Sequence, residues 1–122
     1  MELKTYQKDV IADLEQFLFQ LHHSQDIKKA YEAHWATKGV PMRTTNNIKG
    51  QKPYRDNLGD GTPHVCIKVP TAGGKTFIAT NAIRTIFDNV EDLTHQAVVW
   101  LVPSRTILDQ TYKNLNNPSH PY

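Results

Sequence analysis

Apolar residues recur at helical spacing through the first third of the chain, and this pattern predicts two helices. Between residues 6 and 21 the apolar positions form one helix face, which consists of Val10, Ile11, Leu14, Phe17, Leu18 and Leu21. Thr5 is placed to cap the start of this helix. A weaker pattern predicts a second helix over residues 25–38, with Ser24 as its cap and Gly39 at its end.

The helical pattern stops at residue 39, and the composition changes as far as residue 63. This segment is rich in Gly, Pro, Asn and Thr, which are residues that form turns. The composition predicts one long loop. A loop of this length is uncommon in a small domain and is typical of either a functional or a disordered segment.

Two apolar segments, each followed by a helical pattern, come after the loop. Residues 64–69 alternate and predict a strand, and the pattern from Lys75 to Asp88 predicts a helix. Residues 97–102 form an apolar run typical of a strand covered on both faces, and a helix over 105–115 with Ser104 as its N-cap follows. Two strand–helix units in succession predict an α/β fold with a parallel sheet.

Charge and cysteine content narrow the possible environments and partners. The chain has 14 Lys and Arg against 12 Asp and Glu, so its net charge of +2 does not by itself indicate a nucleic-acid partner. The single cysteine, Cys66, excludes an internal disulfide. The chain has neither a signal-peptide core at its start nor an apolar stretch near the roughly 20 residues that span a bilayer. We therefore expect a cytoplasmic protein with no membrane partner.

The turn between residue 69 and the helix at Lys75 carries the clearest chemistry. Gly74-Lys75-Thr76 completes the second half of a phosphate-binding loop, although Val69 occupies the place of the first glycine of the general pattern. In such a loop the backbone amides and the helix N-terminus face the phosphates, Lys75 reaches them as a point charge, and the Thr76 hydroxyl binds Mg²⁺. The alternative is an ordinary strand-to-helix turn that contains two glycines.

Three segments together resemble superfamily 2 helicases of the DEAD/DEAH-like type. Residues 70–76, Pro-Thr-Ala-Gly-Gly-Lys-Thr, resemble helicase motif I; residues 3–7, Leu-Lys-Thr-Tyr-Gln, resemble the Gln motif; and residues 98–110 resemble motif Ia. Ala72 departs from the usual Gly, and Gly73 is expected to supply the backbone freedom. The branch that the chain resembles most is the helicase domain of type III restriction enzyme res subunits.

The resemblance implies a fold, a set of ligands and a set of site residues. The implied fold is a partial RecA-like P-loop NTPase domain over 1–122, with a helical Gln-motif segment at 1–38, a loop at 39–63, and two strand–helix units at 64–115 that carry motifs I and Ia. The implied ligands are ATP with Mg²⁺ bound through Thr76, and Lys75 is the catalytic lysine. The nucleotide-binding residues are Tyr6, Gln7, Pro70, Thr71, Ala72, Gly73, Gly74, Lys75 and Thr76. The nucleic-acid contacts are Pro103, Ser104 and Arg105.

The resemblance also implies partners and shows what the sequence lacks. DNA and either the rest of a helicase chain or a modification subunit are the expected partners. Motif II of the family is an Asp-Glu pair, and no Asp-Glu dipeptide occurs in the sequence. We therefore expect an ATP-binding N-terminal fragment of a DNA helicase or translocase that is incomplete for hydrolysis by itself.

Two other functions stay open at this point. One is a non-catalytic truncated module that binds a nucleotide or a partner. The other is a small P-loop kinase or GTPase, although the Asn-Lys-x-Asp signature of GTPases is absent. At single positions, Gln7 is alternatively a solvated first-turn residue, Ser104 a helix cap and nothing more, and Arg105 a solvated surface charge.

Overall fold

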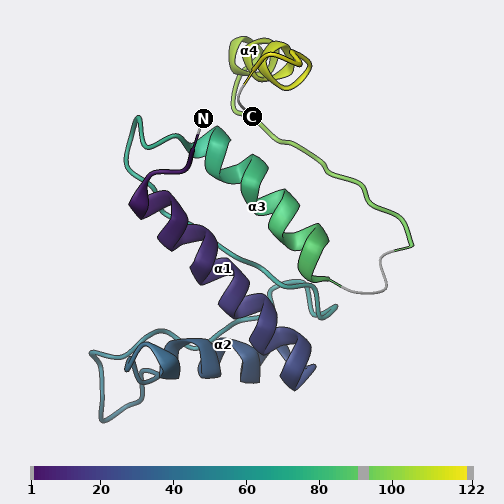
Figure 1. The fold of residues 1–122 in the computed structure, drawn as a ribbon. Helices are drawn as coiled ribbons and strands as arrows, with labels where there is room; N and C mark the ends of the chain where they lie inside the picture. The colour runs from purple at the N-terminus through teal and green to yellow at the C-terminus, as the bar shows by residue number, and fades with distance from the viewer. Residues whose placement is uncertain (1, 91–93, 121–122) are drawn as a thin grey trace. The chain divides into compact units, whose positions relative to one another are not determined.

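The computed structural model describes residues 2–90 and 94–120, and the regular structure of these residues is helical (Figure 1). The helices are α1 (Thr5–Ser24), α2 (Ile27–Thr37), α3 (Lys75–Asn89) and α4 (Arg105–Leu115). The chain divides into two compact units. The first comprises Met1–Ile11 and Val69–Tyr122, and the second comprises Ala12–Lys68, so that α1 begins in the first unit and ends in the second.

The predicted helices are confirmed, with small shifts at their ends. Ser104 caps α4 as expected, because its hydroxyl accepts a hydrogen bond from the backbone N–H of Ile107. At α2 the cap is Asp26, whose carboxylate accepts the N–H of Lys29 at 2.9 Å. The predicted cap, Ser24, instead donates its hydroxyl to the carbonyl of Gln20. Thr5 is the first residue of α1 and not its cap.

The prediction of a parallel sheet, and with it the RecA-like α/β fold, is wrong for the residues that the structure describes. Residues 64–69 and 97–102 form no strand, and the one bridge among the described residues is an isolated pair, Met42 with Gln51. Apolar side chains in both segments are exposed, most of all Val99 at 84% and Leu101 at 87%. Apolar alternation indicates a preference for extended backbone, but a sheet also needs a hydrogen-bonded neighbour. Neither segment has such a neighbour within the described residues.

The apolar face predicted for α4 is present but largely uncovered. Thr111 is buried, whereas the four apolar residues of that face are between 42% and 67% exposed: Ile107, Leu108, Tyr112 and Leu115. By contrast, α3 buries Phe77, Ile78 and Thr85. Periodicity therefore located the helix and its apolar face in α4, but it did not determine whether that face is covered.

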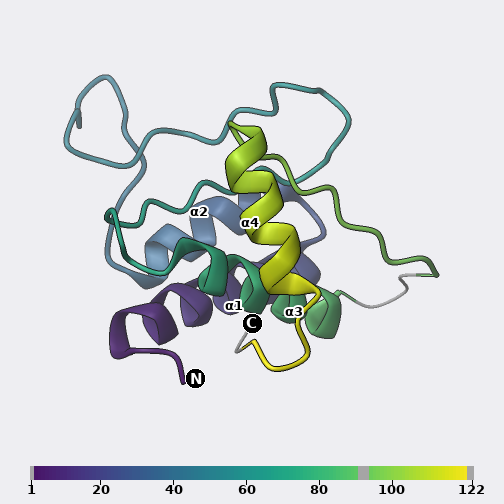
Figure 2. The ribbon, with the colours of Figure 1, turned by 90° about the horizontal axis from the view of Figure 1, so that it is seen from above.

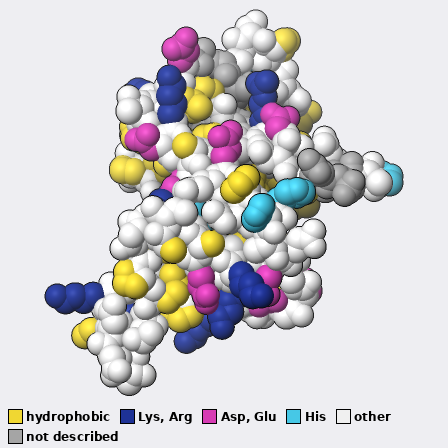
Figure 3. Space-filling view, turned by 60° about the horizontal axis from the view of Figure 1, so that its bottom comes forward, with side chains coloured by type: hydrophobic (Ala, Val, Ile, Leu, Met, Phe, Trp, Pro, Cys, Tyr) yellow, Lys and Arg dark blue, Asp and Glu magenta, His cyan; other side chains and the backbone are white. Residues whose placement is uncertain are grey.

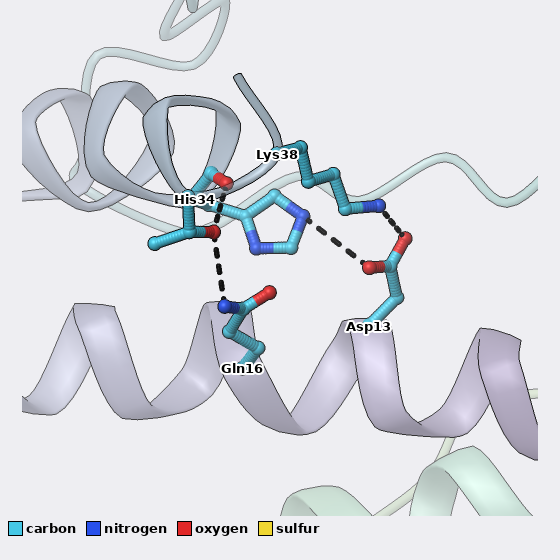
Figure 4. A network of polar contacts seen from close by, with 5 residues as sticks. Asp13, Gln16, His34 and Lys38 are labelled. Atoms are coloured by element: carbon cyan, nitrogen blue, oxygen red, sulfur yellow. Dashed lines mark hydrogen bonds and ion pairs between the residues drawn. The ribbon is translucent and has the colours of Figure 1, made fainter. Parts of the chain in front are cut away.

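In the second unit, a polar network joins α1 to α2 around a buried histidine (Figure 4). The Asp13 carboxylate pairs with the ammonium of Lys38 and lies 3.9 Å from Nε2 of His34. Gln16 donates to the hydroxyl of Thr37, which itself donates to the carbonyl of His34. The ring of His34 is also packed edge-on against Phe17, with 6.0 Å between ring centroids. The two helices are thus held by both apolar and polar contacts.

Figure 2 shows the path of the long loop that follows α2. Specific hydrogen bonds hold this loop. The N–H of Arg43 donates to the carbonyl of Gln51 at 2.6 Å, and the N–H of Gln51 donates to the carbonyl of Pro41 at 2.8 Å. Further along, Asp56 accepts the N–H groups of Gly59 and Gly61. The loop is therefore held by backbone hydrogen bonds in its first part and by a turn around the Asp56 side chain in its second part, and not by a strand ladder.

The turn that leads into α3 contains an alanine in an unfavourable conformation. Ala72 has a φ of +60°, and it is Ala72 and not Gly73 that adopts the left-handed region. A residue with a Cβ atom pays about 1–2 kcal/mol in this region. Two residues on, Gly74 also has a positive φ, of +72°, and serves as the N-cap of α3. Two of the three residues before the helix are thus left-handed.

Replacing Ala72 by glycine is expected to stabilise the chain. The variant Ala72→Gly removes the left-handed strain, while the added freedom of the unfolded chain offsets about 0.5–1 kcal/mol of that gain. We expect the free energy of unfolding, measured by urea denaturation, to rise by up to about 1 kcal/mol. The matched control is Ala12→Gly in the interior of α1, which should lose about 1 kcal/mol. A similar loss in both variants would contradict the strain assigned to Ala72.

His34 is expected to make stability depend on pH. Burial is the largest influence and lowers the pKa of His34 below 6.5, Asp13 raises the pKa, and Lys38 lowers it. Because the folded-state pKa lies below the unfolded value, the unfolded state binds the proton more readily, and stability declines as the pH falls below about 6.5. In urea titrations over this range, His34→Gln should lose part of the decline seen in the unaltered chain. An equal decline in both proteins would refute this role of His34.

Candidate nucleotide-binding site

The carbonyl oxygen of Gly73 joins the start of α1 to the turn before α3. It accepts the Tyr6 hydroxyl at 2.6 Å and the side-chain amide of Gln7 at 3.1 Å. The donors and the acceptor are 66 and 67 residues apart in sequence, and all three lie in the first unit. The structure therefore brings the Gln-motif residues into direct contact with the motif I turn.

Gln7 is buried, with 5% of its surface exposed, and both ends of its amide are bonded. Oε1 accepts the backbone N–H of Lys4 at 2.9 Å, while Nε2 donates to Gly73. The bond to Lys4 is the reach-back half of a capping box, since Gln7 is the third residue of α1 and Lys4 precedes the helix. Sequence reasoning assigned Gln7 to the adenine base and missed this capping contact, which the spacing of the two residues could have indicated. A primary amide has two donors and two acceptor lone pairs, so capacity for a ligand remains.

The two glycines of the turn allow this close approach. A Cβ atom on Gly73 would lie 2.5 Å from Cγ1 of Val69 and 2.9 Å from the carbonyl of Pro70. A Cβ atom on Gly74 would lie 2.5 Å from Nε2 of Gln7. Val69 occupies the place of the first glycine in the general motif, and its side chain fills the space beside Gly73. A side chain at Gly73 would clash with backbone, whereas one at Gly74 would displace the Gln7 amide and would have to adopt a φ of +72°.

The N-terminus of α3 is available to an anion. No side chain caps it, because the N-cap is Gly74. The first N–H groups of a helix have no partner within the helix, and the aligned peptide dipoles place partial positive charge there. Lys75 is exposed and Thr76 is half-buried in the first turn, and Lys75 makes no ion pair within the described part of the chain. This combination suits a phosphate group.

The residues of the predicted nucleic-acid contact lie at the start of α4. The Ser104 hydroxyl accepts the N–H of Ile107 at 3.4 Å, and Pro103 and Arg105 are exposed. In residues 2–90 and 94–120, no hydrogen bond or ion pair joins Ser104 or Arg105 to the turn at 70–76. The structure thus groups Tyr6 and Gln7 with the glycine turn and leaves the motif Ia residues separate from them.

Neither a metal cluster nor a membrane span is found in the described segments. Among these residues no three His, Cys, Asp or Glu side chains gather closely enough to hold a metal ion. A search of the same residues finds no helix with the length and apolar character needed to cross a bilayer.

Comparison with known proteins assigns the chain to a family. The family model described as type III restriction enzyme, res subunit, matches residues 1–122, which is the whole chain. Searches of curated proteins and of solved structures find no match. The chain therefore belongs to the type III restriction enzyme res subunit family, a family of superfamily 2 helicase domains.

Proposed function

We propose that the chain binds ATP with Mg²⁺ at the turn of residues 70–76 and the N-terminus of α3. The observation that carries this proposal is the uncapped N-terminus of α3, which follows a turn where a side chain at Gly73 would clash with backbone and Gly74 has a φ of +72°. Backbone N–H groups in such a turn bind the oxygen atoms of an anion directly. Family membership favours this function over a small P-loop kinase or GTPase.

Each residue of the turn has a role in this proposal. The exposed Lys75 contacts the phosphates as a point charge, and the hydroxyl of Thr76 is a ligand of the Mg²⁺ ion. Pro70, Thr71 and Ala72 form the turn that surrounds the phosphates. The Gly73 carbonyl of this turn accepts hydrogen bonds from two side chains of α1, which position the turn.

Tyr6 and Gln7 are proposed to act on the nucleotide from the adenine side. Each side chain is bonded to Gly73, so binding of the base beside them would be coupled to the phosphate-binding turn. Gln7 can serve both sides, because its amide has one more hydrogen and further lone pairs than the contacts to Lys4 and Gly73 use. The start of α1 and the glycine turn, joined by these bonds, would then bind the base and the phosphates together.

We further propose that residues 1–122 hold ATP without hydrolysing it efficiently. Phosphoryl transfer requires groups that position the attacking water and complete the metal site. In superfamily 2 helicases an Asp-Glu pair supplies them, and this sequence contains no Asp-Glu dipeptide. In this proposal Lys75 is the catalytic lysine and Thr76 supplies one Mg²⁺ ligand, while the acidic pair is not among these residues.

The motif Ia residues are proposed to contact the backbone of DNA. Arg105 is exposed at the N-terminus of α4, where a cation, backbone N–H groups and the Ser104 hydroxyl can meet one phosphate. Pro103 sets the turn that leads into this helix. We also propose that the protein contacts the rest of a helicase chain or a modification subunit.

The variant Lys75→Ala tests the nucleotide site. Loss of a charge-assisted contact worth about 1.5–3 kcal/mol should weaken MgATP binding at least about tenfold in calorimetric titration. The control is Lys68→Ala, which removes another exposed lysine outside the turn and should leave the affinity unchanged. ATP turnover should stay near background in all three proteins.

Two results would count against the proposal. Equal MgATP affinity of Lys75→Ala and the unaltered chain would remove the basis for a site at the N-terminus of α3. Rapid DNA-stimulated turnover by the unaltered 122-residue chain would show that hydrolysis does not need the missing acidic pair.

A further inference from the structure

The second unit contains a run of positive charge that the proposed nucleotide site does not use. Residues 33–55 include Lys38, Arg43, Lys49, Lys52 and Arg55 and contain no Asp or Glu. The net charge of the whole chain is only +2, so this segment concentrates positive charge that the overall composition conceals. All five cations follow α2 and lie in the loop that connects α2 to the glycine turn.

Four of these five cations are uncompensated. Lys38 pairs with Asp13 and lies over the ring of Trp35, so its charge is already engaged. The remaining four are exposed and make no ion pair in the described residues: Arg43, Lys49, Lys52 and Arg55. We call residues 43–55, with these four cations, the basic loop. The space-filling view shows Lys and Arg side chains, in dark blue, at the molecular surface (Figure 3).

The first half of the basic loop is closed on itself. Arg43 donates its backbone N–H to Gln51, which places both arms of the loop side by side. Between these arms Gly50 is buried, and a Cβ atom there would lie 2.5 Å from the carbonyl of Pro41. At the tip, the backbone groups of Thr44 and Asn47 bond to each other. Arg43 and Lys49 are therefore presented from a constrained turn.

The second half of the basic loop is anchored to α2. The Tyr31 hydroxyl donates to the carbonyl of Lys52 at 2.9 Å and accepts the side-chain amide of Gln51 at 2.8 Å. The ring of Tyr31 also contacts Tyr54, with 5.5 Å between ring centroids. The backbone that carries Lys52 is thus attached to a helix, which reduces the entropy lost when its side chain binds a ligand.

The acidic residues next in sequence form no ion pair with the cations of the loop within the described residues. The Asp56 carboxylate accepts the N–H groups of Gly59 and Gly61, and Asp60 accepts the N–H of Thr62. The hydrogen bond from Thr62 lowers the pKa of Asp60, which keeps this carboxylate charged. Both side chains are engaged by the turn that follows, and neither forms an ion pair with Arg55 within the described residues.

We propose that the basic loop binds the sugar–phosphate backbone of a nucleic acid. The residues between Arg43 and Lys49 are Thr44, Thr45, Asn46, Asn47 and Ile48, four of which carry uncharged groups that hydrogen-bond to phosphate and sugar oxygens. An acidic protein partner fits less well, because protein interfaces contain a buried apolar core, and this tip offers one exposed apolar side chain, Ile48. Arg105 belongs to the first unit and the basic loop to the second, so the loop adds a second contact to the proposed DNA interaction, on which this inference rests.

The salt dependence of binding tests this inference. Fluorescence anisotropy of a short labelled DNA duplex would be followed from about 50 to 200 mM salt. Each neutralised phosphate contributes about 0.9 to the slope of log affinity against log salt concentration. The variant in which all four cations are replaced by glutamine, at positions 43, 49, 52 and 55, should reduce the slope by about 3–4. Lys28→Gln with Lys29→Gln, on the exposed surface of α2, is the control and should leave the slope unchanged.

Further variants test whether a change in binding comes from a folding defect. They also distinguish the basic-loop inference from the motif Ia proposal. Lys49→Arg with Lys52→Arg keeps the charge and should retain binding, and circular dichroism melting should show that the glutamine variant is folded. Arg105→Gln should remove about one unit of slope with the basic loop intact, and no effect of Arg105→Gln would overturn only the motif Ia proposal. An unchanged slope in the folded four-site variant would overturn the basic-loop inference, as would competition by polyglutamate as strong as by unlabelled duplex.

Discussion

Two hydrogen bonds to one carbonyl oxygen, that of Gly73, fix the geometry of the candidate site. Tyr6 and Gln7 supply them from the first turn of α1, and the glycines of the turn allow the backbone to come this close. A neutral hydrogen bond of this kind contributes about 0.5–1.5 kcal/mol net, and leaving the buried amide of Gln7 unpaired would cost about 1–3 kcal/mol. The turn at which we propose that phosphate binds therefore depends on a segment more than sixty residues away in sequence.

In the second unit, side chains of the helices hold the irregular backbone of the long loop in place. Tyr31 bonds to the carbonyl of Lys52, and the pair of Asp13 with Lys38 joins α1 to α2. Such contacts hold a long loop without a sheet and keep its cations at the surface. Loops that a rigid scaffold positions in this way often carry binding functions. The proposed phosphate site thus lies in one unit and the basic loop in the other.

Structural features that depend on residues close together in sequence, such as helices and their caps, could be predicted from the sequence. Helical periodicity and the cap at Ser104 depend on residues a few positions apart, and both are confirmed. Whether residues 64–69 and 97–102 form strands could not be predicted from their apolar pattern. A strand needs a hydrogen-bonded partner, and the pattern does not identify one. The contact of Gln7 with Gly73 is equally non-local. Motif resemblance identified both residues, but only the structure shows that they touch.

Hydrogen exchange at the Gly73 amide, which donates to the carbonyl of Pro70 at 3.0 Å, tests the central claim most directly. The variant Tyr6→Phe keeps the ring and removes only the hydroxyl that bonds Gly73. If that bond holds the turn, exchange at Gly73 should accelerate about fivefold, which corresponds to about 1 kcal/mol, while exchange at Ala30 in α2 stays constant. Unchanged exchange at Gly73, or equal acceleration at both amides, would contradict the account.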